Sequence, residues 1–150
     1  MDAEILKAGE GRRLRLGDGV QMVAKEDGTH TRGTLGLAEF ELTPQAQHAP
    51  PPHIHHAHEE GFYVLAGELE MVVGTETVRA GPGTFLMVPI GVPHTFRNAT
   101  EQPARFLCMF TPRRYLDYFE EMSQLFQTTA SPTRQQMADV MARYDTEVVL

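Results

Sequence analysis

Between residues 12 and 110, turn-forming Gly, Pro, Asp and Asn residues interrupt the chain so often that only short β-strands fit between them. Many short strands at this spacing are typical of a β-sandwich or a β-barrel. The pattern therefore predicts an all-β body over about residues 12–110. The expected strands cover residues 13–16, 20–25, 34–42, 62–65, 68–73, 77–79, 84–88, 94–97 and 104–110.

After Phe110 the apolar residues recur at helical spacing, which predicts two α-helices within about residues 112–144. Thr111-Pro112 and Ser131-Pro132 each combine an N-cap residue with proline at the first helical position. We expect the helices to lie outside the β-body, with their apolar stripes packed against it, and not to form a cofactor site. The stripes are Tyr115, Tyr118, Phe119, Met122, Leu125 and Phe126, and then Met137, Val140, Met141 and Tyr144.

Length and composition narrow the class of protein. A chain of 150 residues is one ordinary domain, expected to span residues 1–150, and its net charge of −7 argues against a nucleic-acid partner. Because no stretch of 18 apolar residues occurs and the first residues lack the features of a signal peptide, we expect no membrane contact and a cytoplasmic location. Cys108 is the only cysteine, so no intrachain disulfide can form.

Four of the seven histidines fall in the segment His53-Ile54-His55-His56-Ala57-His58, and Glu59 and Glu60 follow directly. Imidazole and carboxylate groups at this density are difficult to place in an apolar core without partners. Both groups are common ligands of divalent metal ions. The segment, together with the distant His94, therefore indicates a metal site.

The spacing of these residues limits which of them can share one ion. His53 and His55 are two residues apart, so their side chains leave the same face of a strand. Glu60 lies at an odd offset from His55, so a turn or bulge through residues 56–59 has to precede it. His94 follows a turn that contains Gly91 and Pro93. Ligands from separate strands would form a preorganised site within the β-body.

Two motifs in this region resemble the two signatures of the cupin superfamily. His53-x-His55-x4-Glu60-x6-Gly67 is similar to the first, and Gly83-x5-Pro89-x-Gly91-x2-His94-x3-Asn98 is similar to the second in full. Gln47 stands where the first signature usually has glycine, which affects a turn and not a ligand. The resemblance implies a jelly-roll β-barrel with one divalent ion bound by His53, His55, Glu60 and His94.

Other readings of the same residues stay open. His56 and His58 form a second His-x-His pair, but their register gives Glu60 the wrong distance, so we interpret them as surface residues or as neighbours of the ligands. Glu59 is expected to face away from the ion if Glu60 faces toward it. The barrel could also have kept its histidines without binding metal.

Alternation from Glu60 and His94 predicts an apolar and aromatic pocket beside the ion. Such a lining suits a flat organic ligand and suits a sugar phosphate poorly. The alternative is that these side chains simply fill the barrel. Phe62, Val64 and Phe96 follow from the alternation. Depending on the phase of their strands, the further candidates are Phe85, Met87, Phe106, Cys108 and Phe110.

The segments Glu60-Gly61-Phe62-Tyr63-Val64-Leu65-Ala66-Gly67 and Pro89-Ile90-Gly91-Val92-Pro93-His94 are similar to those of small quercetin-dioxygenase-type cupins. This resemblance implies a dioxygenase that acts on an aromatic or enolisable small molecule, with dioxygen as a candidate second substrate. Glu60 would be both a metal ligand and the catalytic base. The ion could be Fe, Mn, Ni, Co, Cu or Zn.

Two alternatives belong to other classes of protein. A non-redox enzyme, such as an isomerase, cyclase or decarboxylase, would use the ion only as a Lewis acid. A small-molecule sensor or storage protein would bind a ligand without turning it over. The family often forms homodimers, and the apolar residues Leu35, Leu37 and Val72 on outer strands would be covered by one.

Overall fold

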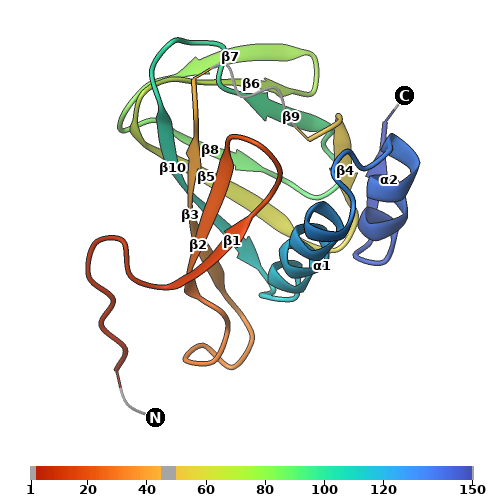
Figure 1. Cartoon of the computed structure of the whole chain (residues 1–150). Helices are drawn as coiled ribbons and strands as arrows, with labels where there is room; N and C mark the ends of the chain where they lie inside the picture. Colours follow the sequence, from red (N-terminus) through yellow and green to blue (C-terminus); the bar gives the residue numbers. More distant parts are fainter. Residues whose placement is uncertain (1–2, 45–49, 150) are drawn as a thin grey trace.

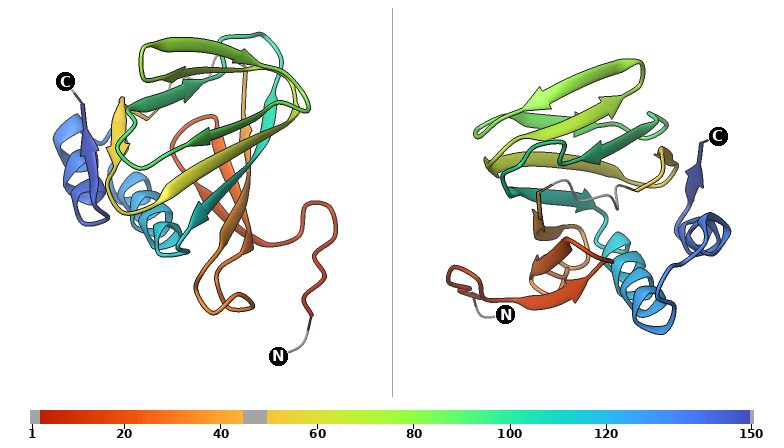
Figure 2. Two further views of the ribbon diagram at one scale, coloured as in Figure 1. Left: turned by 180° about the vertical axis from the view of Figure 1, so that it is seen from behind. Right: turned by 45° about the horizontal axis from the view of Figure 1, so that its top comes forward.

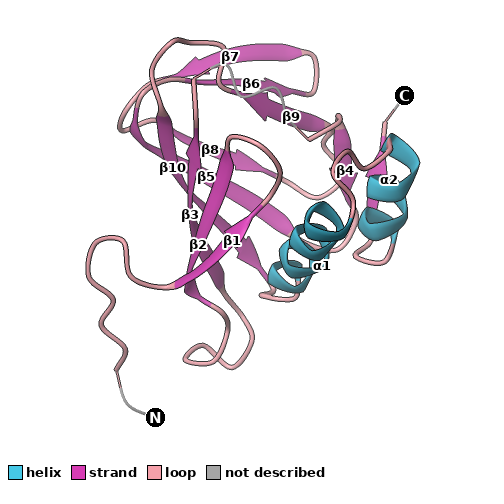
Figure 3. Cartoon of the chain, viewed as in Figure 1, coloured by secondary structure: helices cyan, strands magenta, loops and turns pink. Residues whose placement is uncertain are grey.

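The computed structural model describes residues 3–44 and 50–149, so Gln47 lies outside the described residues. Figure 3 colours the chain by secondary structure, with strands in magenta and helices in cyan. The elements are β1 (Arg12–Arg15), β2 (Val20–Glu26), β3 (Gly36–Leu42), β4 (His53–His55), β5 (Glu59–Ala66), β6 (Leu69–Val73), β7 (Glu76–Ala80), β8 (Phe85–Val88), β9 (His94–Arg97), β10 (Ala104–Thr111), α1 (Tyr115–Thr128), α2 (Arg134–Ala142) and β11 (Thr146–Val148).

Two antiparallel sheets form the body of the molecule (Figure 1). One sheet has the strand order β1-β2-β3-β10-β5-β8, and the other has the order β11-β4-β9-β6-β7. Strands that follow one another in sequence often lie in different sheets, as β4 and β5 do, which is how a jelly roll closes around its core. The predicted all-β jelly roll with two C-terminal helices is confirmed.

Alternation of side chains decides which residues fill the space between the sheets. In β10, Ala104, Phe106, Cys108 and Phe110 are buried and the residues between them are more exposed. Phe106 lies opposite Phe40 of β3, and the two rings stack with centroids 5.2 Å apart. The aromatic residues of the barrel therefore form a packed core.

The same rule corrects two expectations on β8. Leu86 and Val88 lie opposite Phe62 and Glu60 of β5, so these two residues share the inward face. Phe85 and Met87 consequently point outward, and they are 52% and 49% exposed. Phe85 and Met87, candidates only for one phase of this strand, therefore do not line an internal pocket, because the strand has the other phase.

The two helices begin later than the sequence predicts. Thr111 stays in the sheet as the last residue of β10, where it pairs with Glu59, so α1 starts at Tyr115. Helix α2 starts at Arg134, and Thr133 caps it, because its hydroxyl accepts from the Gln136 backbone N–H while the Gln136 side chain accepts from that of Thr133. Over residues 3–44 and 50–149, neither helix combines the length and hydropathy that a membrane span requires.

The C-terminal segment closes one side of the barrel. Helix α1 packs against β1 and α2, and α2 packs against β11, which runs along β4 (Figures 1 and 2). The short strand β11, which the sequence did not predict, pairs with β4, so that Thr146 lies opposite His55 and Val148 lies opposite His53. The chain after the barrel therefore returns to the strand that carries the first two predicted ligands.

Candidate metal centre

The four residues predicted to bind metal meet inside the barrel. His53 and His55 come from β4, Glu60 from β5 and His94 from β9. All four are buried, and their candidate donor atoms lie within 4.8 Å of one another. The structure thus brings together the set of three imidazoles and one carboxylate that the spacing predicted.

Strand geometry explains how the four side chains converge. His53 and His55 leave the same face of β4, and His53 lies directly opposite His94 of β9. Strand β4 ends at His55 and β5 starts at Glu59, so residues 56–58 form the predicted turn. The turn crosses from one sheet to the other, which allows Glu60 to face His55.

Each histidine is oriented by a hydrogen bond at its Nδ1 atom. His53 Nδ1 lies 2.9 Å from the Pro51 carbonyl oxygen, and His94 Nδ1 lies 3.1 Å from that of Val92. A carbonyl oxygen only accepts, so both Nδ1 atoms carry the proton. His55 Nδ1 lies 3.0 Å from the hydroxyl of Thr146, and this hydroxyl donates its own proton to the Tyr144 carbonyl. The three Nε2 atoms are therefore left to bind an ion.

The carboxylate of Glu60 links the site together. Its Oε2 atom lies 2.8 Å from His55 Nε2 and 3.0 Å from His94 Nε2. Its Oε1 atom accepts a hydrogen bond from the Cys108 thiol at 2.9 Å. Burial raises the pKa of Glu60, but the hydrogen bonds to His55 and His94 outweigh burial and hold the pKa well below its ordinary value.

The donor set fits a divalent cation. His55 and His94 face a hydrogen-bond acceptor at both ring nitrogens, whereas a neutral imidazole carries only one N–H. The second nitrogen of each ring therefore needs either an extra proton or a cation beside Glu60. One carboxylate with three imidazoles leaves a net charge of about +1 once a divalent ion is bound, and this combination suits Fe, Ni, Cu, Zn, Mn and Co.

The other acidic and imidazole groups of the segment lie outside this set. The His56 side chain is half-exposed and lies 3.0 Å from Glu147, and Glu59 is exposed and accepts from the Thr111 hydroxyl. His58 is buried, with its ring 4.0 Å from those of His55 and Tyr115. Its Nε2 atom has no hydrogen-bond partner among the described residues. His58 is thus a neighbour of the ligands and not a surface residue.

Burial also sets the charge of two of these histidines. It lowers the pKa of His53 and of His58 to about 3 in each case. Burial also lowers the pKa of His94, but the hydrogen bond to Glu60 outweighs it, so the pKa of His94 is raised. His53 is therefore neutral and ready to bind an ion near pH 7, while His94 holds its proton more firmly.

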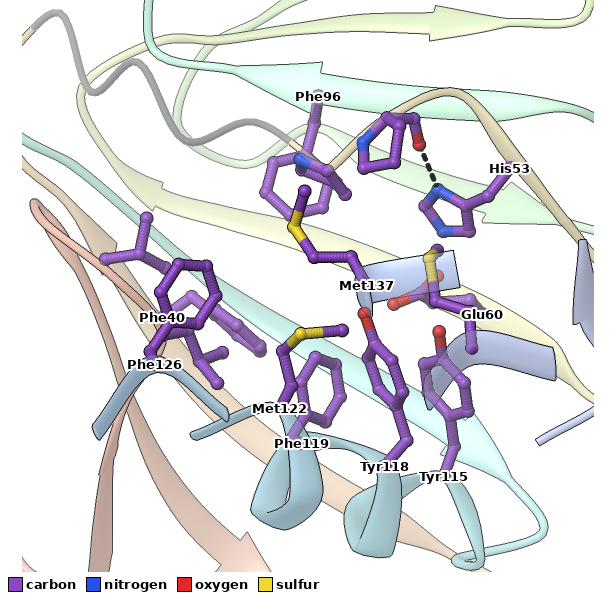
Figure 4. A pocket seen from close by; sticks show the side chains of 15 residues that line it. Phe40, His53, Glu60, Phe96, Tyr115, Tyr118, Phe119, Met122, Phe126 and Met137 are labelled. Carbon is purple, nitrogen blue, oxygen red and sulfur yellow. Dashed lines mark hydrogen bonds between the residues drawn. The ribbon is translucent and has the colours of Figure 1, made fainter. Parts of the chain in front are cut away.

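A cavity of about 250 Å³ lies beside the metal centre. In Figure 4, His53 and Glu60 lie at one end of it, and Phe126 and Phe40 lie at the other. Helices α1 and α2 supply much of the wall. The lining residues are Leu16, Val20, Phe40, Pro50, Pro51, His53, Glu60, Phe96, Tyr115, Tyr118, Phe119, Met122, Phe126, Met137 and Met141.

Of the predicted pocket residues, Phe96 lines this cavity. The others on β5 and β10 are buried in the core behind it, where they fill the barrel, and they are Phe62, Val64, Phe106, Cys108 and Phe110. Most of the other lining residues belong to the helical stripes, for which the sequence predicts only packing surface, and the rest are Leu16, Val20, Phe40, Pro50 and Pro51. The stripes do pack against the barrel, but Tyr118 and Met122 also face the cavity. The helical periodicity of these stripes was the one sequence signal that could have drawn attention to Tyr118 and Met122.

The chain is similar to a known domain family and to relatives whose names indicate different reactions. A model of the cupin domain matches residues 38–110. The chain is 32% identical to quercetin 2,3-dioxygenase of Bacillus subtilis (strain 168) over 94 residues, which are 62% of this chain and only 27% of that enzyme.

Two solved structures combine a similar fold with 25% sequence identity. The polyketide cyclase RemF from Streptomyces resistomycificus has a TM-score of 0.63, covering 73% of this chain and 80% of that one. A sugar phosphate isomerase from a cupin superfamily, from Silicibacter pomeroyi, has a TM-score of 0.62, covering 72% of this chain and 75% of that one.

Proposed function

This chain is a cupin, and from that premise we propose that it is a metal-dependent dioxygenase of an aromatic or enolisable small molecule. The observation that carries the proposal is the position of the metal centre at one end of an apolar cavity. A substrate in this cavity would place an oxygen atom at the ligand cluster and its hydrocarbon part between aromatic side chains.

The charge of the cavity wall favours an aromatic substrate over a sugar phosphate. Of the described residues, those that line the cavity include no lysine and no arginine. A phosphate group is bound by such side chains or by several backbone N–H groups. Phe96, Phe119 and Met122 instead offer apolar surface, which suits a flat ring. The proposed substrate is therefore an aromatic molecule, as the names of the quercetin dioxygenase and the polyketide cyclase suggest, and not a sugar phosphate.

Each polar residue has a role in this proposal. His53, His55, Glu60 and His94 would hold the ion, which would supply a Lewis acid that favours the deprotonated form of an enol or a phenol. Glu60 would take the proton from the substrate hydroxyl group, since a carboxylate at hydrogen-bond distance can act as a general base. The Cys108 thiol would keep the carboxylate in place, because it donates to Oε1 while Oε2 faces the imidazoles.

The second candidate is a non-redox enzyme such as a cyclase, an isomerase or a decarboxylase. The similarity to polyketide cyclase RemF favours it, because a Lewis acid beside an apolar cavity would also suit a reaction through an enolate without dioxygen. The residues would keep the same roles, and dioxygen would not be consumed. A sensor or storage protein would hold the same ligand without turnover.

Oxygen consumption separates these functions. The protein is purified without added metal and its metal content is determined by elemental analysis, and it is then mixed with a panel of flavonols and phenolic enols. We expect about one divalent ion per chain. We also expect substrate turnover that consumes oxygen in air and stops under argon. Turnover that continues under argon would reject the dioxygenase in favour of the non-redox enzyme. Binding without turnover would reject both enzymes.

The remaining expectations are further proposals. We propose that the chain is one cupin domain over residues 1–150, that it is cytoplasmic, and that it forms a homodimer. The exposed apolar side chains of Tyr63, Phe85 and Met87 on β5 and β8 would be covered in a dimer, as would Val72. Light scattering at micromolar concentration tests the homodimer, and a monomer mass would reject it.

A further inference from the structure

A second group of side chains that can bind metal lies outside the barrel centre, at the loop between β2 and β3. Glu26 is the last residue of β2, His30 lies in the loop that follows, and Glu4 comes from the segment before β1. Their candidate donor atoms lie within 4.8 Å of one another. Figure 1 shows the N-terminal segment and this loop at the same end of the molecule. One imidazole and two carboxylates therefore meet from separate parts of the chain.

Backbone N–H groups hold the carboxylate of Glu26 in place. Its Oε1 atom accepts from the Gly28 N–H at 2.7 Å and from the His30 N–H at 3.2 Å. Its Oε2 atom lies 3.4 Å from His30 Nδ1, and its side chain is only 15% exposed. One oxygen thus orients the carboxylate and leaves the other for an ion, as the outer hydrogen bonds of a metal ligand do.

The Nδ1 atom of His30 lies near two carboxylates without a hydrogen bond to either. It is 3.4 Å from Glu4 Oε2 and 3.4 Å from Glu26 Oε2. The atom itself is buried, although the whole side chain is 30% exposed, and it has no hydrogen-bond partner among the described residues. A protonated imidazole would draw a carboxylate oxygen to about 2.8 Å. The arrangement therefore leaves a buried polar atom without the partner that it requires.

A divalent ion would supply this partner. In a tetrahedral site with bonds of about 2.1 Å, two donor atoms are about 3.4 Å apart, which is the separation that His30 Nδ1 has from both carboxylates. A surface cavity of about 390 Å³, lined by Glu4 and His30 among others, leaves room for water as a fourth ligand. The cations that also line this cavity, Arg12 and Lys25, bind other groups of the chain.

We propose that Glu4, Glu26 and His30 form a second site for a divalent metal ion, and that the ion ties the N-terminal segment to the β2–β3 loop. One imidazole with two carboxylates suits Zn²⁺. The site has three protein ligands, and two of them are partly exposed. It should therefore bind more weakly than the barrel centre and be filled only when Zn²⁺ is added. The inference does not depend on the chemistry at the barrel centre.

Isothermal titration of the chelator-treated chain with Zn²⁺ counts the ions that it binds. We expect Glu26→Gln and His30→Gln each to bind about one ion fewer than the unmodified protein. Glu41→Gln, which removes a charge from an exposed position on β3, should bind the same number as the unmodified protein. The loss caused by Glu26→Gln should be the same in a His55→Ala background, so failure of the barrel centre to bind metal is distinguishable. Equal numbers of ions in the unmodified protein, Glu26→Gln and His30→Gln would overturn the inference.

Trypsin cleavage after Lys7 tests whether the ion holds the N-terminal segment. Lys7 is exposed and lies between Glu4 and β1. At a Zn²⁺ concentration about ten times the dissociation constant, cleavage through local opening should slow about tenfold in the unmodified protein. Glu4→Gln changes an exposed residue outside the barrel, so it should fold normally, and Zn²⁺ should not slow its cleavage. Equal cleavage with and without Zn²⁺ in the unmodified protein, or equal protection in Glu4→Gln, would contradict the proposal.

Discussion

At the metal end of the cavity, three imidazole rings are held by directed hydrogen bonds from Nδ1 to Pro51, Val92 and Thr146. At the far end, Phe126, Met122 and Met137 of the two helices form the wall through apolar packing, which has no fixed direction. The metal end can therefore hold a defined donor geometry, whereas the far end can vary in shape without changing it.

This difference implies that chemistry and substrate choice are separable in this chain. Strands β4, β5 and β9 carry the four candidate metal ligands, and the C-terminal helices carry much of the cavity wall. A substitution at one end should then leave the property of the other end nearly unchanged. Tyr115 and Tyr118 are the exception, because their stacked rings line the cavity while Tyr115 also contacts His55.

The largest effect is expected for Glu60→Gln. The amide keeps an oxygen for the ion but is no base, so turnover of an enol found by the oxygen assay should fall about 10²-fold to 10⁴-fold. Metal content should fall far less, as elemental analysis would measure. Glu59→Gln is the matched control, because Glu59 is the exposed neighbour on the same strand. Equal loss of metal and turnover in Glu60→Gln would contradict the base role.

A somewhat smaller effect is expected for His55→Ala. Loss of a partner that only supports a ligand lowers metal affinity 10-fold to 100-fold, so removal of a ligand should lower it more than about 100-fold. Competition with a chelator measures this change. His56→Ala is the control, because its side chain is half-exposed and faces Glu147. If the two variants bound Zn²⁺ equally well, His55 would not be a ligand.

Acid should destabilise the metal-free protein mainly through the metal end. Burial lowers the pKa of His53 and His58 to about 3, so between pH 6.5 and pH 3 the unfolded chain binds protons that the folded chain does not. Stability should fall as the pH drops through this window, by about 2 kcal/mol from pH 7 to pH 5.5. The raised pKa of His94 acts in the opposite direction, since its contribution is present at low pH and is lost as the pH rises.

Urea unfolding at several pH values, with a chelator present, measures this dependence. His58→Phe keeps an aromatic ring beside His55 and Tyr115 but removes one titrating group. We expect this variant to lose about half as much stability on acidification. A variant that loses as much as the unmodified protein would show that His58 does not stay neutral in the folded state.

The metal end could be predicted from the sequence because its rules are local. The two-residue spacing of His53 and His55 fixes a shared face, and the odd offset of Glu60 requires the turn that the structure contains at residues 56–58. The positions of the barrel strands could be predicted in the same way, from the turn-forming residues between them. Local rules failed on β8, where only the register against β5 decides whether Phe85 faces the core.

The far end could not be predicted, because its residues meet through tertiary packing alone. Helical periodicity identified the stripe that contains Tyr118 and Met122, but not the surface on which the helix would lie. Strand β11 is similarly invisible, since three residues carry little pattern and its partner β4 lies about ninety positions away. A resemblance that covers the barrel motifs says nothing about this segment.

The smallest expected effect tests whether the two ends are independent. Met137 of α2 is partly buried and lines the cavity, and Met137→Ala would remove apolar surface from the wall. We expect affinity for the flat aromatic probe 2,3-dihydroxynaphthalene to fall about fivefold, which is roughly 1 kcal/mol of lost apolar contact. Zn²⁺ affinity should not change, because the residue contributes no donor atom to the cluster. Gln135→Ala, on an exposed position of the same helix, is the control. A fall of Zn²⁺ affinity together with probe affinity in Met137→Ala, but not in Gln135→Ala, would contradict this independence. The helices would then also hold the ligand strands in place. The cavity wall could not vary without altering the metal centre.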